Sequence, residues 1–284
     1  MALTINTNLS SMIVQNNLAK STTQLNNAIE RMTTGYKINH AADNAAGYSI
    51  ARNWEAKLGS LDVAADNAAT GADMLSTLED NLALVSQHVQ RVRDLTEQAA
   101  NGTYGSQSKD AIESEITARL QEIDRIAANC EFNGIDLMGG GSEMAIQVGI
   151  DGEASRSQIT LEADLFANTN TSTLLGANVA TIASKCAGKT EGTAPSSMLA
   201  TIDSAISSIS ERVTKLGAAQ NRIESAIESI GVQSENITSS LSTLRDADVA
   251  TESSNYIKAQ ILQQASATLL ATANQTPSIA LNLL

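Results

Sequence analysis

One apolar repeat constrains this chain more than any other feature. Every seventh residue from 202 to 244 is isoleucine or leucine, which gives six successive heptads. The members are Ile202, Ile209, Leu216, Ile223, Ile230, Ile237 and Leu244. A second apolar line holds Ile206, Val213, Ile227 and Leu241, interrupted by Gln220 and Ser234. This spacing is typical of a coiled-coil helix. A helix from about residue 200 to 245 would be about 65 Å long, so it needs a partner of similar length.

Two upstream stretches have the periodicity expected of that partner. The first contains Trp54, Leu58, Leu61, Ala65, Ala68, Ala72 and Leu75, followed one residue out of frame by Leu78, Leu82, Val85, Val89 and Val92. We interpret the shift as a change of phase within one continuing helix. A third helix is expected from about Ser108 to Ala128, with Ile112, Ile116, Leu120 and Ile123 on one face. The pattern predicts a mainly α fold built on a long antiparallel helical bundle.

A short region between these helices has the period of a β-strand. Met144, Ile146, Val148 and Ile150 alternate with polar residues, Asp151-Gly152 supplies a turn, and Ile159 and Leu161 begin a return strand. We therefore expect a small β-hairpin there. Residues from about 168 to 197 are rich in Ser, Thr, Ala, Asn and Gly and show little periodicity, which predicts a surface loop or small subdomain.

Both ends of the chain lack charged side chains. Residues 1 to 19 and 259 to 284 contain none, although 17% of all residues are charged. The ends are nevertheless patterned as helices, with Leu18, Leu25, Ile29 and Met32 at one end and Ile257, Ile261, Ala265 and Leu269 at the other. Two such helices bury too little between themselves to offset a conformational entropy cost of roughly 130 kcal/mol for about 85 residues. We therefore expect them to order against copies of the same chain.

Composition excludes several other classes of protein. The 284 residues include 18 Lys and Arg against 31 Asp and Glu, a net charge of −13, which disfavours binding to nucleic acid. Only seven aromatic residues and two prolines are present, fewer than an α/β enzyme or a β-sandwich needs. We predict no membrane span and no cleavable signal, because no run of about 18 apolar residues occurs and the N-terminus lacks a basic region.

No pattern of chemically active residues emerges. The only cysteines, Cys130 and Cys186, and the only histidines, His40 and His88, lack metal-ligand spacing. We predict no catalytic site, metal or cofactor, a buried Cys130 and an exposed Cys186 thiol. The segment Gln90-Arg91-Val92-Arg93-Asp94-Leu95 leaves two interpretations open. It is either a solvated helix face with salt bridges to its neighbours or a recognition surface.

Several stretches together resemble one family. They are Met1 to Asn8, Arg31 to Asn39, Asp43 with Ala45-Ala46-Gly47, Gln90 to Leu95, Phe132-Asn133-Gly134, Leu216 to Arg222, and Lys258 to Ala265 through Ala273-Asn274-Gln275. With these motifs the chain resembles bacterial flagellin. The resemblance implies a structural, non-enzymatic subunit that polymerises into the flagellar filament for motility. It also implies export in unfolded form by the flagellar type III system, to the extracellular flagellum.

The resemblance also implies a division into layers and a set of partners. Residues 1–43 with 241–284 would form a coiled-coil filament core, residues 44–165 with 200–240 the bundle, and residues 166–199 a short variable surface region. Expected partners are other copies of the chain, a flagellar export chaperone, cap and junction proteins, and the vertebrate Toll-like receptor for flagellin. Arg91, Leu95 and Glu115 are carried over by position as candidates for receptor and inter-subunit contacts. The alternatives are a hook–filament junction protein and a non-flagellar signalling coiled coil.

Overall fold

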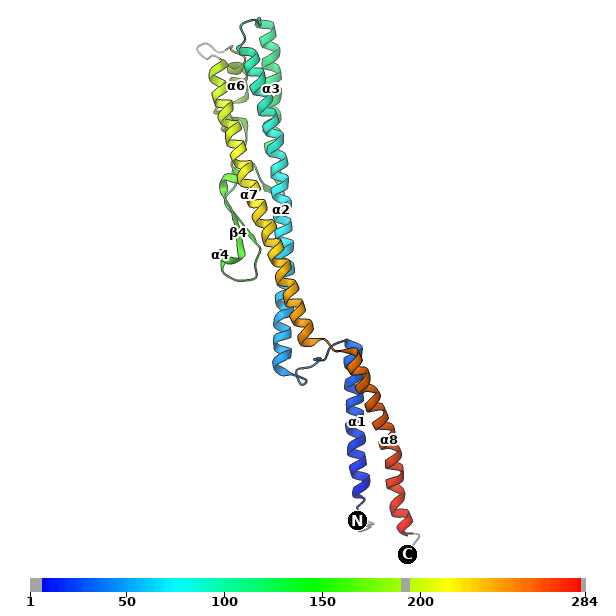
Figure 1. Cartoon of the computed structure of the whole chain (residues 1–284). Coiled ribbons are helices and arrows are strands. Elements are labelled where there is room, and N and C mark those ends of the chain that lie inside the picture. Colours follow the sequence, from blue (N-terminus) through cyan, green and yellow to red (C-terminus); the bar gives the residue numbers. More distant parts are fainter. Residues whose placement is uncertain (1–6, 190–194, 282–284) are drawn as a thin grey trace. The chain divides into compact units, whose positions relative to one another are not determined.

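The chain is mainly helical and carries two short antiparallel strand pairs, as predicted (Figure 1). The structure is a computed structural model that describes residues 7–189 and 195–281. The helices are α1 (Leu9–Thr34), α2 (Ala45–Ala100), α3 (Ser106–Asn129), α4 (Ala154–Ser157), the 3-10 helix η1 (Ala163–Phe166), α5 (Thr171–Leu175), α6 (Val179–Cys186), α7 (Pro195–Arg245) and α8 (Val249–Leu281). The strands are β1 (Glu131–Phe132), β2 (Ile135–Asp136), β3 (Met144–Gln147) and β4 (Gln158–Leu161). The three long helices of the predicted bundle are thereby confirmed.

The residues form two compact units. One contains the residues through Leu58 together with those from Glu235, and the other runs from Gly59 to Ser234. Both α2 and α7 contribute to each unit, because the divisions fall inside these helices. The first unit, the terminal unit, holds the hairpin of α1 and α8. The second, the bundle unit, holds the main apolar core.

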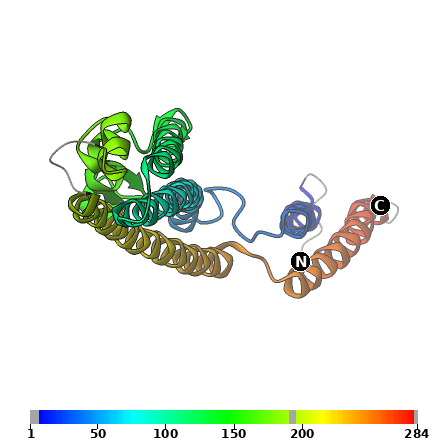
Figure 2. The same cartoon turned by 90° about the horizontal axis from the view of Figure 1, so that it is seen from above.

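The core of the bundle unit lies where α2, α3 and α7 meet (Figure 2). Its fully buried side chains follow the predicted lines on all three helices. They include Leu75, Leu78, Leu82, Val85, Val89 and Val92 of α2, Ile116 and Leu120 of α3, and Ile202, Leu216 and Ile223 of α7. The buried line on α2 passes from Leu75 to Leu78 without a break in the helix, as the phase shift predicts.

The second predicted line on α7 holds only in part. Ile206 and Val213 are half-buried and pack against the core, whereas Ile227 is 36% exposed. The deeply buried second line lies one residue earlier and consists of Ala205, Arg212 and Ala219. The sequence pattern did not identify the alanines, because their small side chains contribute little to an apolar repeat. Alanine nevertheless packs well where two elements approach closely. The burial of a charged residue in the same line is taken up below.

Two hairpins interrupt the helices. The β1–β2 hairpin turns at Asn133-Gly134, where both residues have left-handed backbones with φ of 50° and 77°, as a two-residue hairpin turn requires. The predicted hairpin forms between β3 and β4, with Ile146 paired to Ile159. Its connection includes the single turn of α4 in addition to the expected turn residues. On α2, Gly71 has no side chain at the place where Ile146 approaches.

The segment from residue 168 onward contains two short helices, α5 and α6, which pack on α3. Asn170 and Asn178 cap them, each accepting a hydrogen bond at 2.9 Å from the amide three residues on. Ile182 and Cys186 of α6 are fully buried in the bundle core, so the expectation of an exposed Cys186 thiol is wrong. Cys130 is buried, as expected. Across the described ranges, no helix is both long enough and apolar enough to cross a membrane.

Candidate assembly and recognition surfaces

Capping residues define both ends of α1 and the beginning of α8. The Asn8 side chain accepts a hydrogen bond from the Ser11 amide at 3.1 Å, which begins α1. Gly35 ends α1 in the left-handed conformation, with φ of 75°. At the start of α8, Asp248 accepts from the Thr251 hydroxyl at 2.8 Å and the Ala250 amide at 2.9 Å. These bonds stabilise the carboxylate and lower the pKa of Asp248, chiefly through Thr251.

Small and polar residues line the interface between α1 and α8. The buried residues are Ser11, Ser21 and Ala28 of α1 and Glu252, Ala259 and Ser266 of α8. Hydrogen bonds join the helices at several levels, including Ser11 Oγ to Asn274 Oδ1 at 2.8 Å. Near the other end, Arg31 pairs with the buried Glu252 at 3.4 Å. Such an interface brings the helices together but buries little apolar surface.

The large apolar side chains of the hairpin face outward. Exposed fractions reach 56% for Met12, 60% for Ile261 and 56% for Leu269. The exposed set is Leu9, Met12, Ile13, Ile29, Met32, Val249, Ile257, Ile261, Leu262 and Leu269, while Leu18 and Leu25 are half-buried. A soluble monomer rarely shows so many large apolar residues on two adjacent helices. We call this set the apolar ridges. Residues 1–6 and 282–284 of the charge-free ends lie outside the described residues.

Arg91 of α2 and Glu115 of α3 lie together on the surface of the bundle. Nε of Arg91 donates to Glu115 Oε1 at 2.9 Å, and Nη2 lies 2.9 Å from the same oxygen in an ion pair. Arg119 approaches the same oxygen at 3.8 Å, and all three side chains are more than a third exposed. The structure thus brings two of the three predicted recognition residues into contact. Leu95 is different: it is 2% exposed and packs in the bundle core, so it offers a partner no surface, which corrects its assignment as a contact residue.

Arg93 points to a different helix from Arg91. Its Nε donates to Asp203 of α7 at 2.6 Å, and this bond raises the pKa of Arg93. Residues two apart on a helix lie on roughly opposite sides, so the two arginines join α2 to both neighbours. The first interpretation of this segment, salt bridges to neighbouring helices, therefore describes what both side chains do. A receptor role for Arg91 stays a prediction.

The predicted heptad line of α7 is buried through the bundle unit. Ile202, Ile209, Leu216, Ile223 and Ile230 are each at most 5% exposed. Ile237 and Leu244, which belong to the terminal unit, are half-buried. Most residues of this line therefore pack in the interior of the bundle unit, while the last two are less buried.

Sequence reasoning missed a buried cation on the same helix. Arg212 is 7% exposed; its Nη1 donates to Thr169 Oγ1 at 2.7 Å and its Nη2 to the Leu165 carbonyl at 2.8 Å. Burial lowers the pKa of Arg212. The guanidinium fastens the segment around η1 to α7. Apolar periodicity does not predict a buried arginine, because an arginine within a heptad pattern is normally assigned to the solvent-facing side of the helix.

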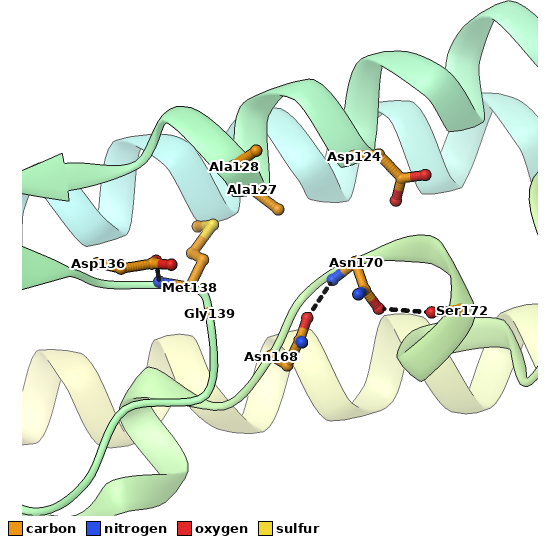
Figure 3. A pocket seen from close by; sticks show the side chains of 9 residues that line it. All are labelled: Asp124, Ala127, Ala128, Asp136, Met138, Gly139, Asn168, Asn170 and Ser172. Carbon is orange, nitrogen blue, oxygen red and sulfur yellow. Dashed lines mark hydrogen bonds between the residues drawn. The ribbon is translucent and has the colours of Figure 1, made fainter.

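The bundle unit also contains a pocket of about 310 Å³ at the end of α3 (Figure 3). Its two carboxylates lie apart, one at each end. Asp124 accepts from the Thr171 amide at 2.7 Å, and Asp136 from the Met138 amide at 2.9 Å. Both therefore order backbone turns. Among the described residues, no group of three or more His, Cys, Asp or Glu is placed to hold a metal ion.

Comparison with known proteins covers most of the chain. The family model of the bacterial flagellin N-terminal helical region matches residues 5–143, and that of the C-terminal helical region matches residues 199–284. The chain is 36% identical to a flagellin of Xenorhabdus nematophila, covering 100% of both chains. It is 31% identical to flagellin FlaB1 of Treponema pallidum (strain Nichols), covering 99% of both. A Vibrio parahaemolyticus structure assigned as a flagellar hook-associated protein shares the fold, with a TM-score of 0.60 and 14% identity over 72% of this chain and 100% of that one.

Proposed function

The chain belongs to the bacterial flagellin family, whose members are structural subunits of the flagellar filament, and from that premise we propose how this subunit assembles. The terminal segments, residues 1–43 with 241–284, form the core of the filament. There, the apolar ridges of α1 and α8 pack against the same helices of neighbouring copies. The observation that carries the proposal is that these ridges point away from the α1–α8 interface.

Physical chemistry favours this arrangement. Covering a half-exposed aliphatic side chain contributes about 1 kcal/mol, so ten of them provide on the order of 10 kcal/mol per subunit. Most of the ridge residues also avoid the repulsion expected of a chain with net charge −13, because they lie within residues 1 to 19 and 259 to 284, which carry no charged side chains. Repeated contacts between different faces of identical chains give an open helical polymer.

A matched pair of variants tests the proposal. Ile261→Asp places a charge on the apolar ridge of α8, where Ile261 is 60% exposed, so it should leave the monomer folded but prevent polymerisation. Ile150→Asp makes the same exchange at the β3–β4 connection, where Ile150 is 37% exposed, and should polymerise normally. Negative-stain microscopy of concentrated protein, with circular dichroism of the monomers, provides the readout. Filament formation by Ile261→Asp at the wild-type rate would contradict the proposal.

We further propose that the subunit is exported unfolded by the flagellar type III system and functions outside the cell. An export chaperone, cap proteins and junction proteins are its partners on this route. Family membership supports this part of the proposal. Fractionation of cells with and without a working flagellar export apparatus tests it: the protein should appear in the medium only when the apparatus works. Equal secretion from both strains would refute this route.

The most specific part of the proposal is that the vertebrate Toll-like receptor for flagellin recognises this chain. The surface formed by Arg91, Glu115 and Arg119 supplies exposed charged groups that a partner can pair with. Arg91→Ala should weaken binding to the receptor ectodomain by ~1 to 3 kcal/mol if it is an anchor. Arg93→Ala is the matched control, because Arg93 pairs with α7 instead of α3. Equal affinity of wild type and Arg91→Ala in a surface-plasmon assay would remove Arg91 from the site.

A further inference from the structure

The two chain crossings of the terminal unit are paired with each other. We call the segment that connects α1 to α2 the first crossing and the segment that connects α7 to α8 the second crossing. The Lys37 amide donates to the Arg245 carbonyl at 2.7 Å, and the Ala247 amide donates to the Gly35 carbonyl at 2.8 Å. Tyr36 and Asp246 thereby form an isolated antiparallel bridge. Two segments more than 200 residues apart in sequence are thus joined by two backbone hydrogen bonds.

The side chain of Arg245 lies over the ring of Tyr36, one of the two bridge residues. Its guanidinium carbon lies 4.0 Å from the centroid of the Tyr36 ring, within the range of a cation–π contact. Its Nη1 pairs with Glu55 of α2, so the same cation contacts a crossing and the next helix. The Arg245 side chain is only 15% exposed, although the carboxylate partner is 31% exposed. A cation so enclosed is strongly attracted to the ring and the carboxylate, since little water competes.

Neighbouring contacts strengthen the same arrangement. Lys37 Nζ donates to the Thr243 carbonyl at 2.8 Å, in the last turn of α7. Farther along the first crossing, Asp43 Oδ2 accepts from the amides of His40 at 3.0 Å and Asn39 at 3.1 Å. These bonds lower the pKa of Asp43, with the His40 amide the largest contributor. The first crossing is therefore ordered along its length by partners that helix periodicity does not reveal.

We propose that Arg245 is a positioning residue that holds both crossings in one conformation through its contacts with the Tyr36 ring and the Glu55 carboxylate. We call this arrangement the clamp. Without the clamp, the bridge between the crossings is held by its two backbone hydrogen bonds and by the contact of Lys37 with Thr243. With it, α1, α2, α7 and α8 are fastened at one point. The consequence for a filament rests on the proposed function: the clamp keeps both crossings in the same conformation in every copy, so it favours a single filament form.

Amide hydrogen exchange of the monomer tests the clamp directly. Arg245→Ala and Tyr36→Leu should each speed exchange of the Lys37 and Ala247 amides at least about tenfold, because the contact that holds Tyr36 against Arg245 is lost. Tyr36→Phe keeps the ring and should behave as wild type. Arg52→Ala is the matched control. Arg52 also pairs with Glu55 and lies over a tyrosine ring, Tyr48, at 5.3 Å, yet the structure gives it no bond to either crossing.

The outcomes separate the clamp from the proposed function. Unchanged exchange at Lys37 and Ala247 in both Arg245→Ala and Tyr36→Leu would overturn the clamp. The same acceleration in Arg52→Ala, or an equal acceleration throughout α1 and α8, would overturn it too. Electron microscopy of polymers then adds a second readout, in which Tyr36→Leu should polymerise into filaments of altered or mixed form, whereas Tyr36→Phe keeps the wild-type form. Failure of the wild type to polymerise would refute the proposed function while leaving the exchange result intact.

Discussion

Cys130 shows how one buried group sets a limit on stability. Its thiol follows α3 and is 3% exposed. Burial raises the pKa of Cys130 from 9.0 to about 11; Asp136 acts in the same direction and Arg212 opposes it. Between these two pH values the unfolded chain loses the thiol proton while the folded chain keeps it. Raising the pH through this window therefore favours unfolding.

We predict that this thiol costs the bundle at most about 3 kcal/mol of unfolding free energy between pH 9 and 11. Urea unfolding of wild type and Cys130→Ala at pH 8, 9.5 and 11 measures it. Other groups also titrate in this range, so the quantity of interest is the difference between the two proteins. That difference should shrink or reverse as pH rises. A constant difference would mean that Cys130 titrates normally in the folded state.

Residues were predicted unevenly from the sequence, for a physical reason. Periodicity reports which side chains avoid water, so it located the core line of α7 and the apolar positions of the terminal helices. It is silent about polar side chains that are buried by a specific partner, such as Arg212 and Arg245. It also failed for Leu95, because a motif identifies a residue without showing that the residue packs inward.

At the scale of elements, α7 offers a clear test of its packing face. Ile223 is fully buried, whereas Ile227, one turn later, is 36% exposed. We predict that Ile223→Asp destabilises the bundle by on the order of 4 kcal/mol, because it buries an unpaired charge. Ile227→Asp should cost less than about 1 kcal/mol, since its carboxylate can reach water. Thermal and urea unfolding compare the two, and equal losses would show that the packing face is misassigned.

The contact between the β3–β4 hairpin and α2 makes a second prediction at this scale. A Cβ added to Gly71 would lie 2.5 Å from Cδ1 of Ile146. Alanine favours a helix over glycine by about 1 kcal/mol, but in wild type this clash should cancel the gain.

Ile146→Val removes the obstructing methyl group. In that background Gly71→Ala should therefore raise the unfolding free energy by up to about 1 kcal/mol. A double-mutant cycle based on urea unfolding gives the coupling between the two positions. Additive effects would show that the hairpin does not approach Gly71 as closely as described.

Elements were predicted well where they are long. The apolar faces of α2, α3 and α7 repeat over many turns, so their existence was clear and only their ends moved. The β1–β2 hairpin was missed because its strands have two residues each, although Asn133-Gly134 is a strong turn signal. Helices α5 and α6 were missed because eight residues or fewer give too short a period to detect.

For the whole molecule, charge and apolar surface are divided between parts of the chain. The ends carry no charged side chains for 19 and 26 residues, and the net charge of −13 is carried by the residues between them. Like charges repel other copies of the chain, while in the proposed assembly the apolar ridges attract one another. On the proposed assembly, a single chain thus contains both the charges that repel other copies and the apolar groups that bind them.

Methionine oxidation measures whether neighbouring copies cover the apolar ridges, which is the central claim. Met12 and Met32 lie on the ridges, 56% and 37% exposed, while Met74 and Met138 in the bundle core are at most 4% exposed and serve as internal controls. Brief peroxide treatment followed by peptide mass spectrometry gives the rate at each position. We predict that Met12 and Met32 oxidise readily in the monomer and at least about tenfold more slowly in filaments, where copies exclude the oxidant. Oxidation of Met12 in intact filaments at the monomer rate would contradict the account.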